Sequence, residues 1–476
     1  MKDDQFYQFY NCIEGGLHSG SQQGRAVDPS TTKELWDVPL ATPDDLEKAV
    51  KSATNAFPSW SSTKWEERAS LLRKAYDVLA SKREQMAILL KLETGKPLRF
   101  ARLEVEHSLG WLNYHANLGP ISPRILQDDE EFQLAIHRVP VGVVAAICPW
   151  NYPLVLAMGK ICASLSTGNC VIVKPSPFTP YSVVKFVELV QGLFPPGVIQ
   201  ALNGDDRLGP WMCQHTGIQK ISFTGSIKTG KAIMAAAAPT LKRLTLELGG
   251  NGASIICPDV DISKTAVQVA IGSFTNSGQY CLASKRLYVH ESIYDTFLKD
   301  FVNEVKSWNT DEKENGDSMS LGPVQNAMQY EIVRGFIRDC RDKGYHFALG
   351  GDTGTQSSFM LKPTVVDNPP DDSAIVKEEP FGPIVPVMKW KTEEEVIRRV
   401  NNTNTGLGGA VWSSDVRKAF TLAERVQAGA VWINGFERPL PHAHLAGHKE
   451  SGLGGEWGEE GLFSYTEPKT FHWYKK

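Results

Sequence analysis

A cysteine and a glutamate have the neighbours that covalent catalysis requires. Cys281 lies in the segment FTNSGQYC, and Gly278 would let another part of the chain or a substrate come close to its thiol. A nucleophilic thiol needs such access and a favourable local field. Glu247 lies in the apolar run LTLEL before two glycines, where burial would raise its pKa toward that of a useful general base. Taken alone, the two segments also fit a core cysteine and a solvent-exposed glutamate.

Four further side chains lie where ligands often bind. Asn151 stands between two prolines in CPWNYPL, so its amide is held on a rigid turn and suits a donor to an oxyanion. Lys174 closes the run CVIVK, at the edge of a parallel sheet where ligands bind. Glu379 and Phe381 lie in the turn KEEPFGP. An ordinary turn asparagine, a solvated lysine and a polar loop remain the alternatives.

Alternating strands and helices must position these residues. From Val141 onward, the β-branched runs VGVVAAI, CVIVKP, VIQALN, KISF and RLTLEL alternate with helical stretches at 152–164, 181–193 and 226–237. A second alternation runs from 254 to 431. This pattern is typical of parallel sheets with crossover helices. We therefore expect an α/β protein with two α/β domains in series.

Other segments depart from this alternation. Residues 43–95 carry apolar residues at helical spacing, with a helix start at TPDD. The segments 121–139 and 463–476 indicate extended chain that pairs outside the main sheets. No GxGxxG fingerprint of a dinucleotide fold follows the first strand of either domain, because GSIKTG has a different spacing.

Composition excludes several other classes of protein. The 476 residues carry a net charge of -4 and 22% charged side chains, so no basic face for nucleic acid is expected. The eight cysteines form no CxxC pair, which predicts reduced thiols and no metal site. The start MKDDQFYQFY does not resemble a secretory signal, and no window of about 18 apolar residues predicts a membrane span. We expect a cytoplasmic protein.

Seven fragments occur together in the order and spacing of one enzyme family. They are PWNYPL, VIVKPS, ISFTGS, LELGGN, NSGQYC, EEPFGP and HKESGLGGEWGEEGL. On these motifs the chain resembles the aldehyde dehydrogenase superfamily over nearly its whole length. The resemblance implies an NAD(P)+-dependent enzyme that oxidises an aldehyde to a carboxylic acid.

The resemblance also implies a role for each candidate catalytic residue. Cys281 matches the nucleophile, whose thiohemiacetal with the aldehyde becomes a thioester after hydride transfer. Asn151 matches the side-chain donor that binds the oxyanion together with the backbone N–H of Cys281. Glu247 matches the base that activates water for thioester hydrolysis. Lys160 and Glu456 match two residues of a proton relay.

A three-part architecture follows from the same resemblance. Residues 1–119 and 141–249 would form an atypical Rossmann cofactor domain, which lacks the usual fingerprint. Residues 250–449 would form a second α/β domain that is catalytic. Residues 120–140 and 450–476 would form a small β extension for oligomerisation, so a homodimer or homotetramer is expected.

The cofactor side shows one departure from the family pattern. The residues that match the cofactor site are Trp150, Lys174, Ser176, Gly225, Ser226, Glu379 and Phe381. Three positions after Lys174, many NAD+-preferring relatives carry a glutamate that repels the 2′-phosphate of NADP+, and this chain carries Pro177. Repulsion of NADP+ is therefore reduced, and either NAD or NADP is expected as the cofactor.

The aldehyde tunnel departs from the family pattern as well. Its matching positions are Tyr152, Leu156 and Gly159 on one helical face, Tyr280 and Leu282 beside the nucleophile, and Leu445 on the opposite wall. Gly252 replaces an aspartate that is frequent in relatives, and this departure predicts nothing about the tunnel. Gly159 and Leu445 stand where relatives often carry large rings, the latter in HLAG where PFGG is common. This predicts a wide, apolar tunnel for bulky apolar or aryl aldehydes, unless neighbouring side chains close the gap.

Two other functions remain to be weighed. A CoA-acylating relative would transfer the acyl group to CoA, but such enzymes generally lack the glutamate at position 247. A non-catalytic member, kept as a structural or binding protein, would be expected to lose Cys281, Glu247 or Asn151. All three residues are present. The expected partner is a small-molecule aldehyde, with neither nucleic acid nor membrane involved.

Overall fold

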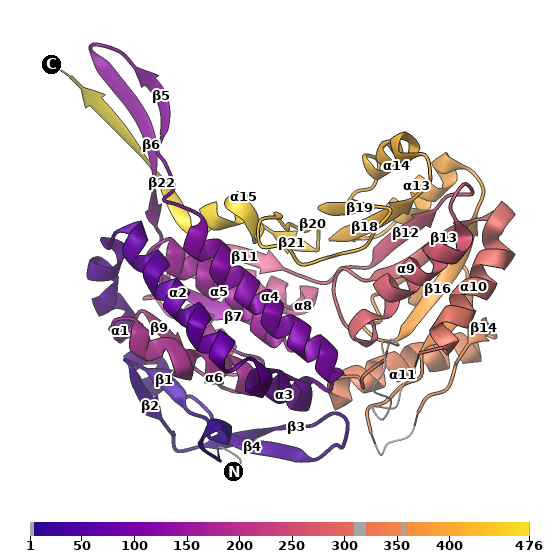
Figure 1. The fold of residues 1–476 in the computed structure, drawn as a ribbon, viewed down its shortest axis with the longest axis horizontal. Helices are drawn as coiled ribbons and strands as arrows, with labels where there is room; N and C mark the ends of the chain where they lie inside the picture. The colour runs from indigo at the N-terminus through magenta and orange to yellow at the C-terminus, as the bar shows by residue number, and fades with distance from the viewer. Residues whose placement is uncertain (1–3, 309–319, 355–357, 476) are drawn as a thin grey trace.

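Two α/β halves and a projecting arm make up the protein. We describe residues 4–308, 320–354 and 358–475 of a computed structural model (Figure 1). The half drawn in indigo and magenta holds the first sheet, and the half drawn mainly in orange holds the second. The α/β class expected from the alternating pattern is confirmed.

The first sheet is built around the strand-like runs that follow Val141. Within the described residues its eight strands run in the order β2-β1-β9-β8-β7-β10-β11-β21. The five central strands are parallel: β7 (Val143–Ile147), β8 (Cys170–Lys174), β9 (Ile199–Ala201), β10 (Lys220–Thr224) and β11 (Arg243–Glu247). Antiparallel strands close its edges: β1 (Asn11–Ile13), β2 (Gly16–His18) and β21 (Gly452–Leu453).

Helices connect and cover these strands. The crossover helices are α5 (Pro153–Ser166), α6 (Tyr181–Val190), α7 (Leu208–Gln214) and α8 (Ile227–Ala237). The N-terminal helical region forms α1 (Pro43–Ser61), α2 (Trp65–Ser81), α3 (Arg83–Thr94) and α4 (Leu98–Asn117), with a two-stranded sheet of β3 (Gln23–Val27) and β4 (Glu34–Pro39) before them. The predicted helix start is confirmed, because Thr42 and Asp45 form a reciprocal capping box.

The second sheet repeats the parallel arrangement. Among the described residues its order is β14-β15-β16-β13-β12-β18-β19, and only β14 is antiparallel. The strands are β12 (Gly252–Ile256), β13 (Ser284–His290), β14 (His346–Leu349), β15 (Thr364–Asp367), β16 (Ile384–Trp390), β18 (Gly408–Trp412) and β19 (Ala430–Ile433). Its helices are α9 (Ile262–Phe274), α10 (Tyr294–Lys306), α11 (Ala327–Asp342), α12 (Ala374–Lys377), α13 (Glu393–Asn401) and α14 (Val416–Ala423).

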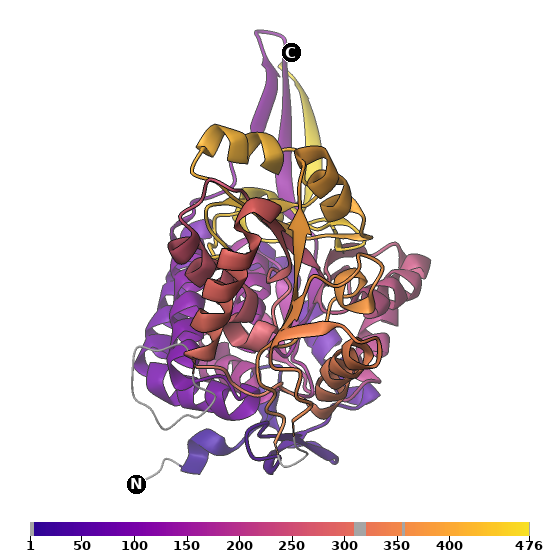
Figure 2. The same ribbon diagram turned by 90° about the vertical axis from the view of Figure 1, so that its right-hand side faces the viewer.

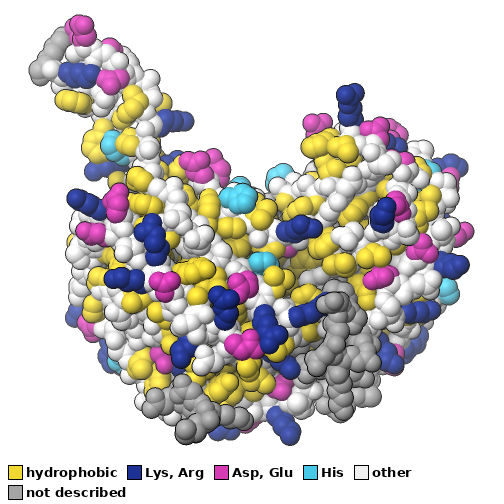
Figure 3. All heavy atoms as spheres, in the orientation of Figure 1, with side chains coloured by type: hydrophobic (Ala, Val, Ile, Leu, Met, Phe, Trp, Pro, Cys, Tyr) yellow, Lys and Arg dark blue, Asp and Glu magenta, His cyan; other side chains and the backbone are white. Residues whose placement is uncertain are grey.

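The two extended segments predicted from the sequence pair with each other in an arm. β22 (Thr466–Tyr474) pairs with β6 (Phe132–Pro140), which pairs with β5 (Arg124–Asp128). The arm projects from the body in both views (Figures 1 and 2). Apolar side chains lie exposed along it (Figure 3): Ile125, Leu126, Phe471, Trp473 and Tyr474.

The stretch before β22 belongs with the body. β21 pairs with β11 of the first sheet, and β20 (His448–Lys449) pairs with β17 (Thr405–Gly406) of the second half. The short helix α15 (Gly458–Phe463) follows. Of the range 450–476 that the sequence assigns to the extension, only the part from Thr466 onward pairs in the arm. No helix of the described residues is both long and apolar enough to span a bilayer.

Candidate active site

Cys281 lies on a loop with a constrained backbone. The loop follows α9 through a short 3-10 turn, in which Asn276 and Ser277 have φ of 52° and 56°, a conformation that L residues rarely adopt. Gly278 also has positive φ, and a Cβ there would collide with the carbonyl of Gly382. The close approach expected at Gly278 is thus to another backbone segment. Of the eight cysteines, Cys281 alone is not fully buried.

Asn151 reaches this loop from the other half of the protein. It follows β7 in the turn before α5, and its side chain is buried. Its Nδ2 donates a hydrogen bond to the carbonyl of Gln279 at 3.0 Å. A side-chain amide carries two donor hydrogens, so one anchors Asn151 and the second is free to bind another acceptor near Cys281.

Glu247 is the last residue of β11 and is 4% exposed. Neither carboxyl oxygen has a hydrogen-bond partner within the described residues. Burial first, and then the charge of Glu456, raise the pKa of Glu247 well above that of an ordinary carboxyl. The alternative of a solvent-exposed glutamate at a strand end is therefore wrong.

Lys160 and Glu456 contact each other close to Glu247. Lys160, on α5, places its Nζ 2.5 Å from Glu456 Oε1 and donates to Thr224 Oγ1 at 2.8 Å. Thr224 is the register partner of Glu247 on the neighbouring strand, and Ser222 also donates to Glu456. The pair expected from the resemblance is brought together beside the carboxyl of Glu247.

Burial and nearby carboxylates both favour the thiol form of Cys281. Burial, and then the carboxylates of Glu379 and Glu247, raise the pKa of the Cys281 thiol. Since Cys281 and Glu247 both have raised pKa values, each holds its proton more tightly than the free side chain does. Chemistry that needs a thiolate and a carboxylate base is therefore expected to become faster as the pH rises.

Residues expected at a cofactor come from both halves. Trp150 and Phe381 form an edge-to-face ring pair with centroids 5.3 Å apart. Ser226 caps α8 by accepting from Thr229 N at 3.1 Å. A Cβ at Gly225 would collide with the ring of Phe223, so a larger residue would displace that ring from the turn before α8, a helix start of the kind that favours anions.

Glu379 and Lys174 are two further candidates for the cofactor site. Glu379 Oε1 is buried without a hydrogen-bond partner in the described residues, which suits a hydroxyl donor such as that of a ribose. Burial lowers the pKa of Lys174 to about 8, while the charges of Asp205 and Asp206 counteract this shift. These two aspartates were not predicted, and their negative charges near Lys174 disfavour the extra phosphate of NADP+.

The comparisons with known proteins agree with this geometry. The sequence model of the aldehyde dehydrogenase family matches residues 17–471. The aldehyde dehydrogenase LUC3 of a Fusarium species is 40% identical over 472 residues, which cover 99% of this chain and 100% of that protein.

The chain belongs to the aldehyde dehydrogenase family.

Two solved structures extend this result to the cofactor. An NAD+ complex of the Bacillus cereus aldehyde dehydrogenase has a TM-score of 0.95 and 33% identity, over 100% of this chain and 99% of that one. An NADP-dependent enzyme of E. coli has a TM-score of 0.95 and 29% identity, over 100% of both chains. The protein is thus an NAD(P)+-dependent aldehyde dehydrogenase.

An apolar cluster faces Cys281 in this aldehyde dehydrogenase. Its buried members are Tyr280, Leu282, Ala283, Leu407 and Leu445, and Tyr152, Trp432 and Trp457 pack against them. The tunnel candidate Leu156 lies outside this cluster and packs against the core of the first half. Ser176, a candidate for the cofactor site, is not part of the cluster either. Gly252 lies close behind the loop, since a Cβ there would come within 2.7 Å of the Ala283 carbonyl.

The expected gap at Gly159 is filled. A Cβ at Gly159 would lie 2.8 Å from Trp457 Nε1 and 3.4 Å from Trp111 Nε1. The two indoles pack edge to face with centroids 5.1 Å apart. The prediction that Gly159 widens the tunnel is therefore wrong: rings supplied by α4 and by the C-terminal segment take the place of a ring on α5.

A carboxyl group near the aldehyde side was not predicted from the sequence. Glu437 is half-buried, and burial raises its pKa to about 7. Its charge acts on Cys281, Tyr152 and Tyr280. Glu437 lies in the loop segment FERPLP, whose pattern predicts only an irregular connection, so the sequence alone gave no reason to select it. Within the described residues no group of acidic, histidine or cysteine side chains is arranged to hold a metal ion.

Proposed function

We propose that this aldehyde dehydrogenase is of the hydrolytic type and forms a thioester on Cys281. The observation that carries the proposal is the convergence of a cysteine that is not fully buried, a buried unpaired carboxyl and an anchored amide from different elements. The thiolate of Cys281 attacks the aldehyde carbon and gives a thiohemiacetal. The free amide hydrogen of Asn151 stabilises the resulting oxyanion.

The remaining residues serve hydride loss and hydrolysis. A nicotinamide cofactor, when bound, would supply the acceptor for the hydride that the former aldehyde carbon loses, and Cys281 would then carry the acyl group as a thioester. Glu247 then takes a proton from the water that attacks the thioester. Lys160 and Glu456, which contact each other beside Glu247, pass that proton away from the site.

The cofactor residues divide between the two halves. Lys174, Ser176 and the turn at Gly225 and Ser226 hold the adenosine and pyrophosphate end. Trp150 would lie beside the pyrophosphate, and Glu379 and Phe381 would hold the nicotinamide end, where Glu379 Oε1, which has no partner in the described residues, could accept a hydrogen bond from a ribose hydroxyl. Pro177 is exposed and uncharged, so both NAD+ and NADP+ are used, with NAD+ equal or preferred.

The aldehyde is apolar or aromatic. The side chains beside Cys281 support this, since the proposed tunnel residues Tyr152, Tyr280, Leu282 and Leu445 present rings and branched aliphatic groups. Glu437 disfavours aldehydes that carry a second carboxylate, because two negative charges would approach each other in a partly desolvated space.

The division of the chain follows the three structural parts. Residues 1–119 and 141–249 form the cofactor-binding domain, residues 250–449 carry Cys281 and add Glu379 and Phe381 to the cofactor site, and the arm joins copies of the chain. The exposed apolar side chains on the arm support an oligomer, a homodimer or homotetramer, because side chains of this kind are usually covered by a partner. A cytoplasmic location completes the proposal.

The test is the stoichiometry of the reaction without CoA. With benzaldehyde and NAD+, we expect one carboxylic acid for each reduced cofactor, at a rate that added CoA does not change. Acyl-CoA formation, with no acid in its absence, would instead indicate the CoA-acylating alternative. No reduced cofactor with any aldehyde would indicate a non-catalytic family member.

A further inference from the structure

The turn that carries Asn151 is held from outside its own helix. α5 begins at Pro153, and the preceding Tyr152 makes no side-chain cap. Glu104, on α4, caps the helix instead: its Oε1 accepts from Leu154 N at 2.9 Å and from Val155 N at 3.3 Å. The first amides of α5, which a helix leaves unsatisfied, are thus satisfied by a carboxylate fifty positions away in sequence.

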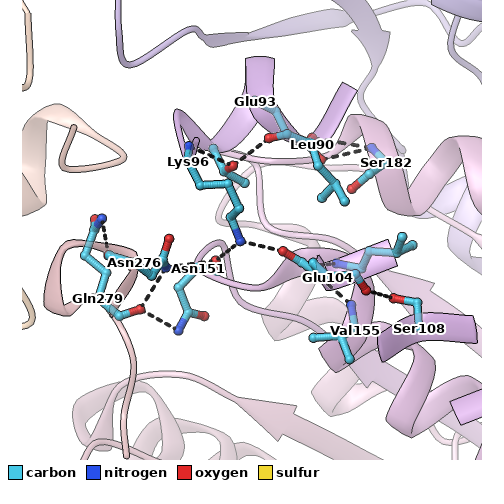
Figure 4. Close-up of polar contacts among 12 residues, drawn as sticks. Leu90, Glu93, Lys96, Glu104, Ser108, Asn151, Val155, Ser182, Asn276 and Gln279 are labelled. Atoms are coloured by element: carbon cyan, nitrogen blue, oxygen red, sulfur yellow. Dashed lines mark hydrogen bonds and ion pairs between the residues drawn. The ribbon is translucent and has the colours of Figure 1, made fainter. Parts of the chain in front are cut away.

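Lys96 connects this cap to Asn151. Its Nζ forms an ion pair with Glu104 and donates to the carbonyl of Asn151 at 2.9 Å (Figure 4). Both side chains of the pair are 0% exposed. The same ammonium lies 4.0 Å from the centre of the Tyr152 ring. The buried ammonium of Lys96 therefore contacts both Asn151 and Tyr152.

The loop of Cys281 completes the arrangement from the other half. Asn276 Nδ2 donates to the carbonyl of Asn151 at 3.3 Å, and Asn151 Nδ2 donates to the carbonyl of Gln279 at 3.0 Å (Figure 4). Gln279 is fixed in turn, since its Oε1 accepts from Gln325 N at 2.9 Å. Asn151 is thus held at its carbonyl and at one amide hydrogen, which leaves the second amide hydrogen with a defined direction.

We propose that Lys96 and Glu104 are positioning residues of the reaction: they fix the turn so that the free amide hydrogen of Asn151 meets the oxyanion formed beside Cys281. The inference rests on the proposed function of Asn151. An oxyanion donor is effective only within a few tenths of an ångström of its acceptor. The carbonyl that Lys96 holds belongs to the same residue as that donor.

A buried ion pair is a poor explanation for stability alone. Removing two charges from water costs several kcal/mol for each ion, so apolar side chains of similar volume are often as stable or more stable. A purely structural role predicts that Lys96 affects all variants of the enzyme alike. A positioning role predicts that its effect disappears once the amide of Asn151 is gone.

The experiment is a double-mutant cycle on the pre-steady-state burst of reduced cofactor with benzaldehyde and NAD+. Lys96→Met, paired with Glu104→Gln so that no buried charge is left alone, should lower the burst rate constant by about 10- to 100-fold. In an Asn151→Ala background the same pair of changes should cause less than about a threefold loss. Equal losses in both backgrounds would overturn the inference.

Two further variants make the result specific. Lys185 is a fully buried lysine that pairs with Glu188 and donates to the Gln8 carbonyl, both at 2.7 Å. Lys185→Met should therefore leave the burst unchanged, and a loss equal to that of the Lys96 variant would contradict the inference.

Asn276→Gly keeps a backbone with positive φ and removes the second donor to Asn151. If the Lys96 variant does not fold, Asn276→Gly takes its place in the double-mutant cycle with Asn151→Ala. Additive effects of these two changes on the burst rate constant would overturn the inference. A wild-type burst in Asn151→Ala alone would instead reject the proposed role of Asn151.

Discussion

Cys281 has two sides that differ in chemistry and in origin. On one side lie Asn151, Glu247 and Glu379, polar groups at strand ends and turns, with the two carboxyl groups at raised pKa. On the other side lies the apolar cluster around Tyr280 and Leu445, built mainly from loops, with Tyr152 from the turn before α5 and Trp432 from β19. The comparison teaches that both sides depend on loops, since of the polar groups only Glu247 lies within a strand; in our proposal the polar groups set the reaction and the apolar side chains set the choice of aldehyde.

Removing the sulfur of Cys281 should abolish aldehyde oxidation, to which both sides contribute. Cys281→Ala is expected to lower turnover by roughly 10⁴-fold or more, because no thiohemiacetal can form. Cofactor binding, followed by the fluorescence of added NADH, should remain. Cys340→Ala removes a fully buried thiol on α11 and should keep its activity. A Cys281→Ala enzyme as active as the wild type would refute the mechanism.

On the polar side, Glu247→Gln should separate the two half-reactions. Steady-state turnover is expected to fall by about 10²- to 10⁴-fold, while a burst of reduced cofactor near one per site persists. Because its raised pKa keeps Glu247 protonated at low pH, wild-type turnover should rise with pH, and the variant should lose this dependence. Rapid-mixing kinetics across a pH series provides the measurement, and unchanged steady-state turnover would contradict the assignment.

The cofactor end of the polar side is tested by Pro177→Glu. A carboxylate at this exposed position should lower kcat/KM for NADP+ by about 10- to 100-fold through repulsion of the 2′-phosphate, with little effect on NAD+. Pro177→Gln matches the change in size without the charge and should spare both cofactors. If the wild type shows no turnover with NADP+ at saturating aldehyde, Asp205 and Asp206 outweigh the missing carboxylate.

On the apolar side, Glu437→Gln should have the smallest effect. The variant is expected to raise kcat/KM for para-carboxybenzaldehyde by about threefold to tenfold, and to leave benzaldehyde nearly unchanged. Since the pKa of Glu437 is raised to about 7, the carboxylate is charged above this pH, and the gain should be larger at pH 9 than at pH 6. The same gain for both aldehydes would mean that Glu437 acts through shape alone.

The sheets and the polar side could be predicted because their sequences are locally informative. β8 and β11 are short runs of buried residues that end in Lys174 and Glu247, and parallel strands bring such ends to one edge. The resemblance then assigned a role to each residue. The order of the strands did not follow from the sequence, since it depends on which edge each crossover helix returns to.

The filled gap at Gly159 and the buried cation at Lys96 could not be predicted for physical reasons. A charged pair eight residues apart in a helical region, such as Lys96 and Glu104, normally faces solvent, and only the packing of α4 on α5 buries it. Gly159 indicated open space, but Trp457, nearly three hundred positions later, fills it. Contacts between distant segments of this kind are not encoded in any local pattern.

The central claim is that the acyl group is carried on Cys281. The most direct measurement is the mass of the Glu247→Gln enzyme, quenched in acid after one turnover with benzaldehyde and NAD+, followed by peptide mapping. We expect one benzoyl group per chain on the peptide that contains Cys281, and none when the cofactor is omitted. Stoichiometric reduced cofactor without an adduct, or an adduct on another residue, would contradict the account.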